Sequence, residues 1–454
     1  MKNTIDFFKE IASIPRESGH EEKIADYIES FAKERDLDYI RDEYNNIIIK
    51  KNINDSSPII LQAHLDMVCE KEEGKTFDFA NDSIDLIISD RYITADGTTL
   101  GADDGIGVAQ ILNVLNSNIN RNVEAIFTVA EETSMLGAEK IDLSGLKGKT
   151  MINLDGFEAD TILVGAASFT DIDIITNYNE KEKVNNLYKI KLSGLKGGHS
   201  GDDINKKRGN SNLLLTELLL NINDLQISDF NGGNKINVIP SSSEVVIKTD
   251  EKIEQIVNSF LKAQRKVYNN LNIELESISE GKVLSKEDTN KFLNSIITIN
   301  HGVISTNDRD EVVTSKNLSV VNLKDNLIRI GLRSSNENER LEIVRSLKEI
   351  CKENSYTFKI VGHQPGFCTS EHSNLVKKLK DNYYNLNNEN PFVKTLHVGL
   401  EVGLLKEKIK DLEVAVISPN IIGAHTTEEK VEIASIEKCD RWLFEFLNSW
   451  KIYL

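Results

Sequence analysis

Five side chains of metal-binding type stand at, or just past, the ends of short apolar runs. They are His64, Asp103, Glu132, Asp155 and His425. Two imidazoles and three carboxylates form a nitrogen and oxygen ligand set that suits divalent cations. If parallel strands carry these residues to one edge of a sheet, two cations could bind there with a water between them. The chemistry expected of such a pair is metal-assisted hydrolysis.

Two further acids stand next to these ligands in the sequence. Asp66 follows His64 by two residues in LQAHLDMV, and alternation along an extended segment places both side chains on one face. Asp66 could therefore orient the imidazole without binding a cation itself. Glu131 directly precedes Glu132 in AIFTVAEETS, so one carboxylate could reach a cation while the other faces the attacking water.

Each motif also has a simpler interpretation. Asp103 and Asp104 stand among glycines where a helix should begin, and an aspartate there is an ordinary helix cap. Glu131 and Glu132 could form a solvated acidic loop, and His425 could be a surface histidine. The combination favours the metal site, because ligands of an open α/β sheet lie outside the carboxyl ends of its strands. Three carboxylates held so close together also require cations.

The segments that carry these motifs have the pattern of an α/β domain. Strands are expected at 44–50, 58–63, 123–130 and 151–154, and helices at 4–14, 21–34, 103–117 and 135–141. Their alternation predicts a mostly parallel sheet flanked by helices.

The pattern changes near residue 166 and returns near residue 370. The intervening stretch predicts strands at 171–177, 187–192, 237–239, 244–249, 318–323, 326–333 and 357–361, and helices at 212–222, 253–268, 288–298 and 337–353. After it, a helix at 372–387, a strand at 413–418 and a helix at 434–449 are expected. The sequence therefore predicts a catalytic domain in two segments, 1–165 and 370–454, interrupted by an inserted α+β domain at 166–369.

The bulk composition excludes several classes of function. The 454 residues are too many for one core, and 39% hydrophobic with 28% charged residues is ordinary for a globular protein. A net charge of −18 argues against a nucleic-acid partner and against an anionic membrane surface. The sequence contains neither a signal peptide nor an apolar run of about 18 residues, so a soluble, cytoplasmic protein is expected.

The four cysteines do not suggest a site. Cys69, Cys351, Cys368 and Cys439 lack CxxC spacing, so neither a zinc ribbon nor a disulfide framework is indicated. Cys69 lies near His64, but no further histidine and asparagine arrangement supports a cysteine hydrolase.

The motifs together resemble the M20 metallopeptidases. HLDMV, GADDGIG, AEETSMLGA, NLDGFE, GGHSG and GAHTTEE match in order, spacing and neighbours over nearly the whole chain. The resemblance extends to the aminoacyl-histidine dipeptidase branch through GLKGGHSG, DFNGG and LHVGLEVG.

The resemblance implies a role for each metal-binding residue. His64, Asp103 and Asp155 are expected to bind one zinc, and Asp103, Glu132 and His425 the other, with Asp103 bridging the two. Manganese or cobalt could replace zinc at such ligands.

The resemblance implies further roles for the remaining residues. Asp66 would orient His64, Glu131 would act as general base, and His199 in GGHSG would stabilise the oxyanion from the inserted domain. In several relatives that histidine comes from the partner subunit, so a homodimer formed through the inserted lid domain is expected. Glu401 is a candidate for holding a substrate amino group, and Arg333 or Asn237 for holding a carboxylate.

The expected function is therefore hydrolysis of dipeptides, including those ending in histidine. Two departures from the family pattern are present: Asp103-Asp104-Gly105 where many relatives have Asp-x-Lys, and Val402 where cysteine is expected. The alternatives are an N-acyl amino acid deacylase, a tripeptidase or a carboxypeptidase with the same cations, and a non-catalytic metal-binding protein on the same fold. The last is disfavoured because every expected ligand and Glu131 are present.

Overall fold

The computed structural model describes residues 2–178 and 182–450, and the chain divides into two compact units. The first unit comprises Met1–Ala166, Phe367–Leu396 and Leu400–Leu454, and the inserted unit comprises Ala167–Gly366 and His397–Gly399. The chain therefore leaves the first unit one residue later than the sequence indicated and returns to it three residues earlier.

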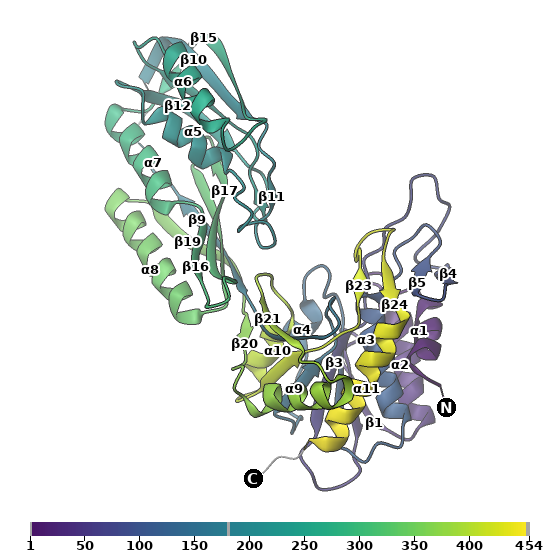
Figure 1. Ribbon diagram of the computed structural model, residues 1–454. Helices are drawn as coiled ribbons and strands as arrows, with labels where there is room; N and C mark the ends of the chain where they lie inside the picture. The colour runs from purple at the N-terminus through teal and green to yellow at the C-terminus, as the bar shows by residue number, and fades with distance from the viewer. Residues whose placement is uncertain (1, 179–181, 451–454) are drawn as a thin grey trace. The chain divides into compact units, whose positions relative to one another are not determined.

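The first unit is built on a nine-stranded sheet (Figure 1). Across the sheet the strands are β1 (Asp38–Arg41), β2 (Ile47–Lys51), β6 (Val123–Thr128), β3 (Ile59–His64), β7 (Thr150–Asn153), β22 (Glu413–Val416), β8 (Thr161–Ala166) and β20 (Phe367–Cys368), and β21 (Phe392–Leu396) also pairs with β8. The neighbours β6, β3, β7 and β22 run parallel, so their carboxyl ends meet at one edge. The pairings outside them are antiparallel, apart from that of β21 with β8. The expected α/β fold is confirmed, but the sheet is mixed, with parallel strands only at its centre and at β21.

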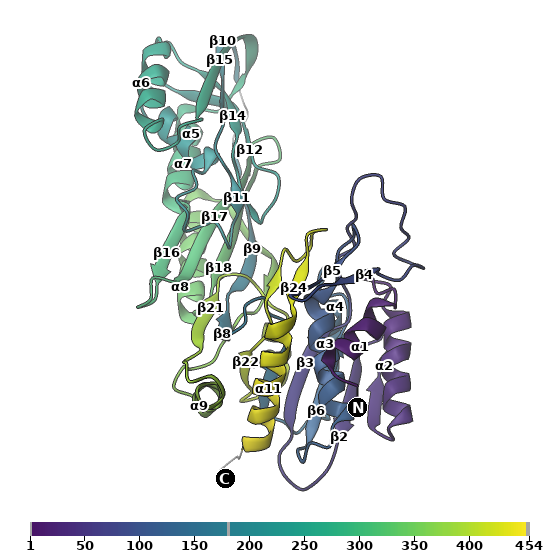
Figure 2. The same cartoon turned by 45° about the vertical axis from the view of Figure 1, so that its right-hand side comes forward.

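Helices cover both faces of this sheet (Figure 2). One face packs against α1 (Thr4–Ala12), α2 (Glu22–Glu34), α3 (Ala102–Asn116), α9 (Asn374–Asn387) and α11 (Ile433–Ser449), and the other against α4 (Leu136–Lys140) and α10 (Val402–Lys408). Along β3, Leu61 belongs to the first core and Ile60 to the second. A strand buried on both faces appears in the sequence as a continuous apolar run, which is why β3 and β6 could be predicted.

A small second sheet holds the loop that carries His425. Its order is β23 (Ile421–Ile422), β24 (Lys430–Glu432), β5 (Tyr92–Ala95) and β4 (Leu86–Ile88). Because β23 and β24 pair antiparallel, the segment between them is a hairpin loop with both ends fixed.

The inserted unit has an α+β fold, in which helices pack against an antiparallel sheet. Its antiparallel sheet has the order β15 (Asn272–Val283), β10 (Glu182–Ser193), β14 (Ser243–Lys248), β12 (Gln226–Gly232), β17 (Val312–Asn322), β18 (Leu327–Ser334), β9 (Ser168–Ile175) and β19 (Thr357–Gln364), with β16 (Gly302–Thr306) beside β17. A separate pair joins β11 (Gly198–His199) and β13 (Val238–Ile239). One core lies between the large sheet and α5 (Ser211–Leu219), α6 (Glu254–Gln264), α7 (Lys286–Ile299) and α8 (Glu337–Asn354).

Within the inserted unit, the sequence did not predict β11, β12, β15 and β16. β15 lies at the edge of the sheet and exposes residues on both faces, so it lacks the alternation of a half-buried strand.

Residues His397–Gly399 belong to the inserted unit although the chain on both sides of them belongs to the first. His397 Nε2 lies 2.7 Å from Ser315 Oγ of β17. Burial and the positive charge of Arg333 lower the pKa of His397 to about 4.

Within the described ranges, no helix is both long enough and apolar enough to cross a bilayer.

Truncating Leu61 should destabilise the first unit. Leu61 is fully buried at the centre of β3, so Leu61→Ala should lower the free energy of unfolding by about 2–5 kcal/mol. Ile40→Ala is the control, because Ile40 is 56% exposed and its change should stay within about 0.5 kcal/mol. Denaturant unfolding followed by fluorescence measures both. Equal stability of the two variants would contradict this assignment of the core.

His397 should make the inserted unit less stable in acid. The unfolded chain binds a proton below the ordinary histidine pKa of 6.5, whereas the folded unit does so only near 4. The stabilisation is therefore complete above pH of about 6.5 and is lost as the pH falls through about 4.

The comparison of His397→Gln with wild type tests this at pH 7 and pH 5. The melting temperature of wild type should fall more between these pH values than that of the variant. His372→Gln, at an exposed histidine, should behave as wild type. Identical pH profiles for His397→Gln and wild type would rule out the effect.

Candidate metal centre

Four neighbouring parallel strands lead to the predicted ligands. His64 is the last residue of β3, Glu132 follows β6 and Asp155 follows β7. His425 lies beyond β22, in the hairpin loop between β23 and β24. The four parallel strands are adjacent, so their following residues meet at one edge of the sheet. Asp103 reaches the same edge from the start of α3.

Two groups of three residues could each hold one ion. His64, Asp103 and Asp155 each offer a ligand atom within 4.8 Å of the others, and Asp103, Glu132 and His425 do the same. These are the groups expected from the resemblance, and their role as ligands stays a prediction.

Asp103 lies between the two imidazoles. Its Oδ1 is 3.1 Å from His64 Nε2, and its Oδ2 is 2.9 Å from His425 Nε2. Glu132 Oε1 lies 3.0 Å from the same nitrogen of His425. One carboxylate that presents a different oxygen to each group has the geometry of a bridging ligand, so the residues fit a pair of divalent cations.

Protons and cations would compete for these ligands. Hydrogen bonds with Asp103 and Glu132 raise the pKa of His425 to about 10. Burial works against ionisation of Asp103, but its hydrogen bonds with His425 and His64 outweigh burial and lower its pKa. Burial, with the charge of Asp103 nearby, raises the pKa of Asp155 well above its ordinary value. The negative charge of these buried carboxylates is therefore balanced only in part, because few cationic side chains lie near them.

Asp66 connects two ligand-bearing segments. Its Oδ1 lies 3.4 Å from His64 Nδ1, and its backbone oxygen lies 3.1 Å from the same nitrogen. Its carboxylate also accepts hydrogen bonds from the backbone N–H groups of Glu131 (3.0 Å) and Glu132 (3.2 Å). The residue therefore contacts the imidazole and also fixes the backbone of the acidic pair.

Asp104 caps the helix and holds His64. The backbone at Asp103 and Asp104 is not helical, and Asp104 Oδ1 accepts a hydrogen bond from the N–H of Gly107 at 3.2 Å. Its Oδ2 accepts a hydrogen bond from the N–H of His64, also at 3.2 Å. The capping interpretation of Asp104 is correct, and the same side chain also positions β3.

Glu131 lies beside the candidate ligands. Its carboxylate oxygen, one from Glu132 and a ring nitrogen of His64 lie within 4.8 Å of one another. Burial raises the pKa of Glu131 well above the ordinary glutamate value; nearby Asp155 acts in the same direction, while His64 opposes it. A carboxylate with a raised pKa is better matched to proton transfer near neutral pH.

Glu401 is placed differently from what the sequence suggested. It is fully buried, and its Oε1 accepts hydrogen bonds from Gln62 Nε2 (2.5 Å) and Thr128 Oγ1 (2.6 Å). A carboxylate without exposed surface gives no support to the expected contact with a substrate amino group, and that contact stays a prediction. Burial raises the pKa of Glu401 to about 7.

The other predicted residues belong to the inserted unit. His199 Nδ1 lies 3.2 Å from Asp202 Oδ2, and its side chain is 34% exposed. Arg333 is buried against the ring of Phe169, its Nε has no hydrogen-bond partner among the described residues, and burial lowers its pKa to about 10. Asn237 is exposed, and its backbone oxygen accepts a hydrogen bond from the N–H of Ser200 at 2.9 Å.

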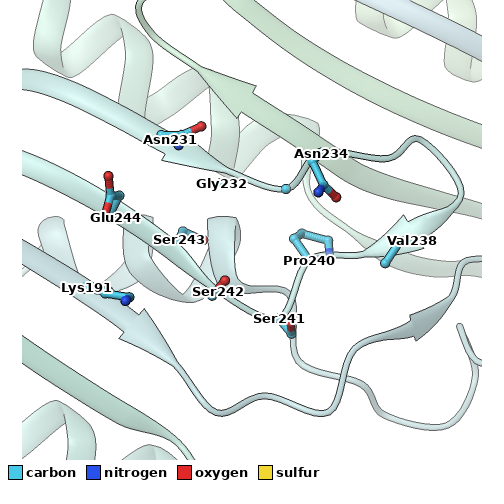
Figure 3. A pocket seen from close by; sticks show the side chains of 11 residues that line it. Lys191, Asn231, Gly232, Asn234, Val238, Pro240, Ser241, Ser242, Ser243 and Glu244 are labelled. Atoms are coloured by element: carbon cyan, nitrogen blue, oxygen red, sulfur yellow. The ribbon is translucent and has the colours of Figure 1, made fainter.

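The inserted unit also contains a polar pocket of about 450 Å³ (Figure 3). Its lining comes from β10, the end of β12 with the loop after it, β13, and the start of β14 with the loop before it. The lining residues are Lys191, Asn231, Gly232, Gly233, Asn234, Val238, Pro240, Ser241, Ser242, Ser243 and Glu244. None of the predicted site residues lines it.

Sequence reasoning missed several residues that hold the site. Arg16, Glu21 and Glu429 are buried charged residues whose hydrogen bonds go largely to backbone groups of the ligand loops. Glu429 stands within the GAHTTEEK motif, where only His425 was singled out. Gln62 interrupts the apolar run of β3, and a polar residue inside a buried strand was the signal that could have drawn attention to it.

The chain is similar to known peptidases in sequence and in fold. The sequence is 33% identical to the cytosol non-specific dipeptidase of Escherichia coli over 95% of this chain and 94% of that protein. The fold matches the crystal structure of an aminoacylhistidine dipeptidase from Vibrio alginolyticus with a TM-score of 0.90 and 29% identity, covering 99% and 96% of the two chains. An aminopeptidase of Bacillus cereus shares the fold at a TM-score of 0.57 and 15% identity, covering 98% and 97% of the two chains.

The model of peptidase family M20/M25/M40 matches residues 60–449, which include all five candidate ligands. Together with the extent of the similarity to the Escherichia coli enzyme, this match shows that the chain belongs to peptidase family M20/M25/M40, whose members are hydrolases acting on peptide bonds.

Proposed function

We propose that this protein is a metallopeptidase that hydrolyses dipeptides with a pair of divalent cations. The observation that carries the proposal is the placement of Asp103, which presents one carboxylate oxygen to each of two imidazoles. The names of the Escherichia coli and Vibrio alginolyticus relatives, both dipeptidases, support this substrate class.

Bound cations, for which zinc is proposed and manganese or cobalt are substitutes, would acidify an attacking water and polarise the scissile carbonyl. The residues of the chain transfer the proton and position the reacting groups. Glu131 takes the proton of the water and passes it to the leaving amine. Asp66 accepts a hydrogen bond from the backbone N–H of Glu131, which keeps Glu131 in position, and its carboxylate also orients His64. His199 is proposed as the donor to the oxyanion, a contribution typically worth about 2.7–4 kcal/mol.

Binding of the substrate carboxylate is assigned to Arg333, with Asn237 as a second candidate. The buried guanidinium of Arg333 has an Nε without a partner among the described residues, which supports a role in anion binding. A homodimer formed through the inserted unit and a cytoplasmic location also belong to the proposal. The similarity to a cytosol dipeptidase of Escherichia coli supports the location.

Glu131→Gln should separate catalysis from metal binding. The amide cannot take a proton, so kcat should fall by about 100- to 10,000-fold while two ions per chain are retained. Glu132→Gln is the matched neighbour: it removes a candidate ligand and should lower the metal content as well. Elemental analysis and a dipeptide assay measure both variants. Wild-type turnover in Glu131→Gln would show that another group is the base.

A substrate panel should distinguish a dipeptidase from its relatives. Dipeptides with free termini, including Xaa-His, should be cleaved faster than N-acyl amino acids, tripeptides and longer peptides. Removal of metal with a chelator should abolish cleavage, and added Zn²⁺, Mn²⁺ or Co²⁺ should restore it. Preferential cleavage of acylated amino acids would instead identify a deacylase, and activity that persists after complete metal removal would contradict the mechanism.

A further inference from the structure

Glu429 binds the backbone that leads to Asp103. Its Oε2 accepts hydrogen bonds from the N–H groups of Leu100 (2.8 Å) and Gly101 (2.9 Å). Its Oε1 accepts them from Ala102 (2.9 Å) and Asp103 (3.2 Å). Four consecutive N–H groups on one carboxylate require both oxygens to be acceptors at the same time.

These bonds join two distant parts of the chain. Glu429 lies four residues after His425 in the hairpin loop between β23 and β24, whereas residues 100–103 lead into α3. Asp103 and His425 are thus connected through their side chains and also through Glu429 and the backbone of Asp103. A shift of either loop would change the distance between these two residues.

Arg16 extends the connection to β3. Its guanidinium donates to the carbonyl oxygens of Leu65 (3.0 Å) and Asp66 (2.9 Å) and to that of Gly101. Residue 101 is a glycine with φ +68°, and a side chain there would collide with Arg16, because an added Cβ would lie against Nη2. One segment therefore gives its N–H groups to Glu429 and a carbonyl oxygen to Arg16.

We propose that Glu429 is a positioning residue that fixes the two oxygens of Asp103 between His64 and His425. It is not a ligand, because its oxygens are occupied by backbone N–H groups. The proposal rests on the proposed function in that Asp103 must bridge two cations. Groups that orient a ligand typically change metal affinity by about 10- to 100-fold when they are removed.

The test is cation binding by Glu429→Gln and by its matched control Glu428→Gln. The amide introduced by Glu429→Gln would turn one acceptor into a donor, which opposes two of the four N–H groups. Glu428 is exposed, so the same change there should leave binding intact. Metal-depleted protein is titrated with Zn²⁺ against a chromophoric chelator, and with Co²⁺ while its visible spectrum is recorded.

Glu429→Gln should bind Zn²⁺ about 10- to 100-fold more weakly, with an altered Co²⁺ spectrum and an unchanged far-ultraviolet circular dichroism spectrum. Its dipeptidase activity should recover as Zn²⁺ is raised, which a purely structural defect would not do. Wild-type affinity and a wild-type Co²⁺ spectrum in Glu429→Gln would overturn the proposal.

Glu429→Asp keeps the charge and shortens the side chain by one methylene, so it serves if Glu429→Gln does not fold. It should also weaken Zn²⁺ binding, and wild-type affinity there would equally overturn the proposal. Wild-type protein that binds no pair of cations or cleaves no dipeptide would refute the proposed function instead. A wild type that does both, beside an unaffected Glu429→Gln, would refute only the role of Glu429.

Discussion

The first unit depends on gathering buried carboxylates at the carboxyl edge of its parallel strands. Asp66, Asp103, Asp104, Asp155 and Glu401 are all nearly inaccessible to water there. Buried negative charges so close together repel one another unless cations or hydrogen-bond donors compensate them. Asp66, Asp104 and Glu401 accept hydrogen bonds, which leaves the candidate ligands Asp103 and Asp155 to be balanced by two imidazoles. Divalent cations would add positive charge at these two ligands, where the proposed chemistry also needs them.

Three carboxylates that are not candidate ligands accept hydrogen bonds from backbone N–H groups near the site. Asp104 binds the N–H of His64, Asp66 those of Glu131 and Glu132, and Glu429 that of Asp103. Each bond fixes the main chain from which a functional side chain projects. Positioned this way, ligands need little reorganisation when an ion binds.

Beneath the ligands, a buried polar network crosses three parallel strands. Glu401 accepts from Thr128 of β6 and Gln62 of β3, and Gln62 Oε1 accepts from Asn153 of β7 at 2.5 Å. Asn153 Oδ1 in turn accepts from the N–H of Asp155. The strands that deliver Glu132, His64 and Asp155 are therefore linked by side chains as well as by the sheet. Of the two carboxylate oxygens of Glu401, only Oε1 takes part, and Oε2 has no partner among the described residues.

The sequence by itself predicted β3, β6, β7, β22 and every described helix except α10, because apolar runs and helical spacing are local properties. It did not predict the parallel pair of β8 and β21. It also identified the five candidate ligands, since HLD, EE, NLD and GAH stand at or after the ends of expected strands and DD stands where a helix is expected to begin. Only the tertiary structure decided which side chains hold those residues. Arg16 and Glu429 act on the backbone of segments distant in the chain, and Glu401 is buried beneath the site rather than exposed in it. Contacts between segments far apart in the chain leave no periodicity in a sequence, because they depend on how the strands are ordered in the sheet.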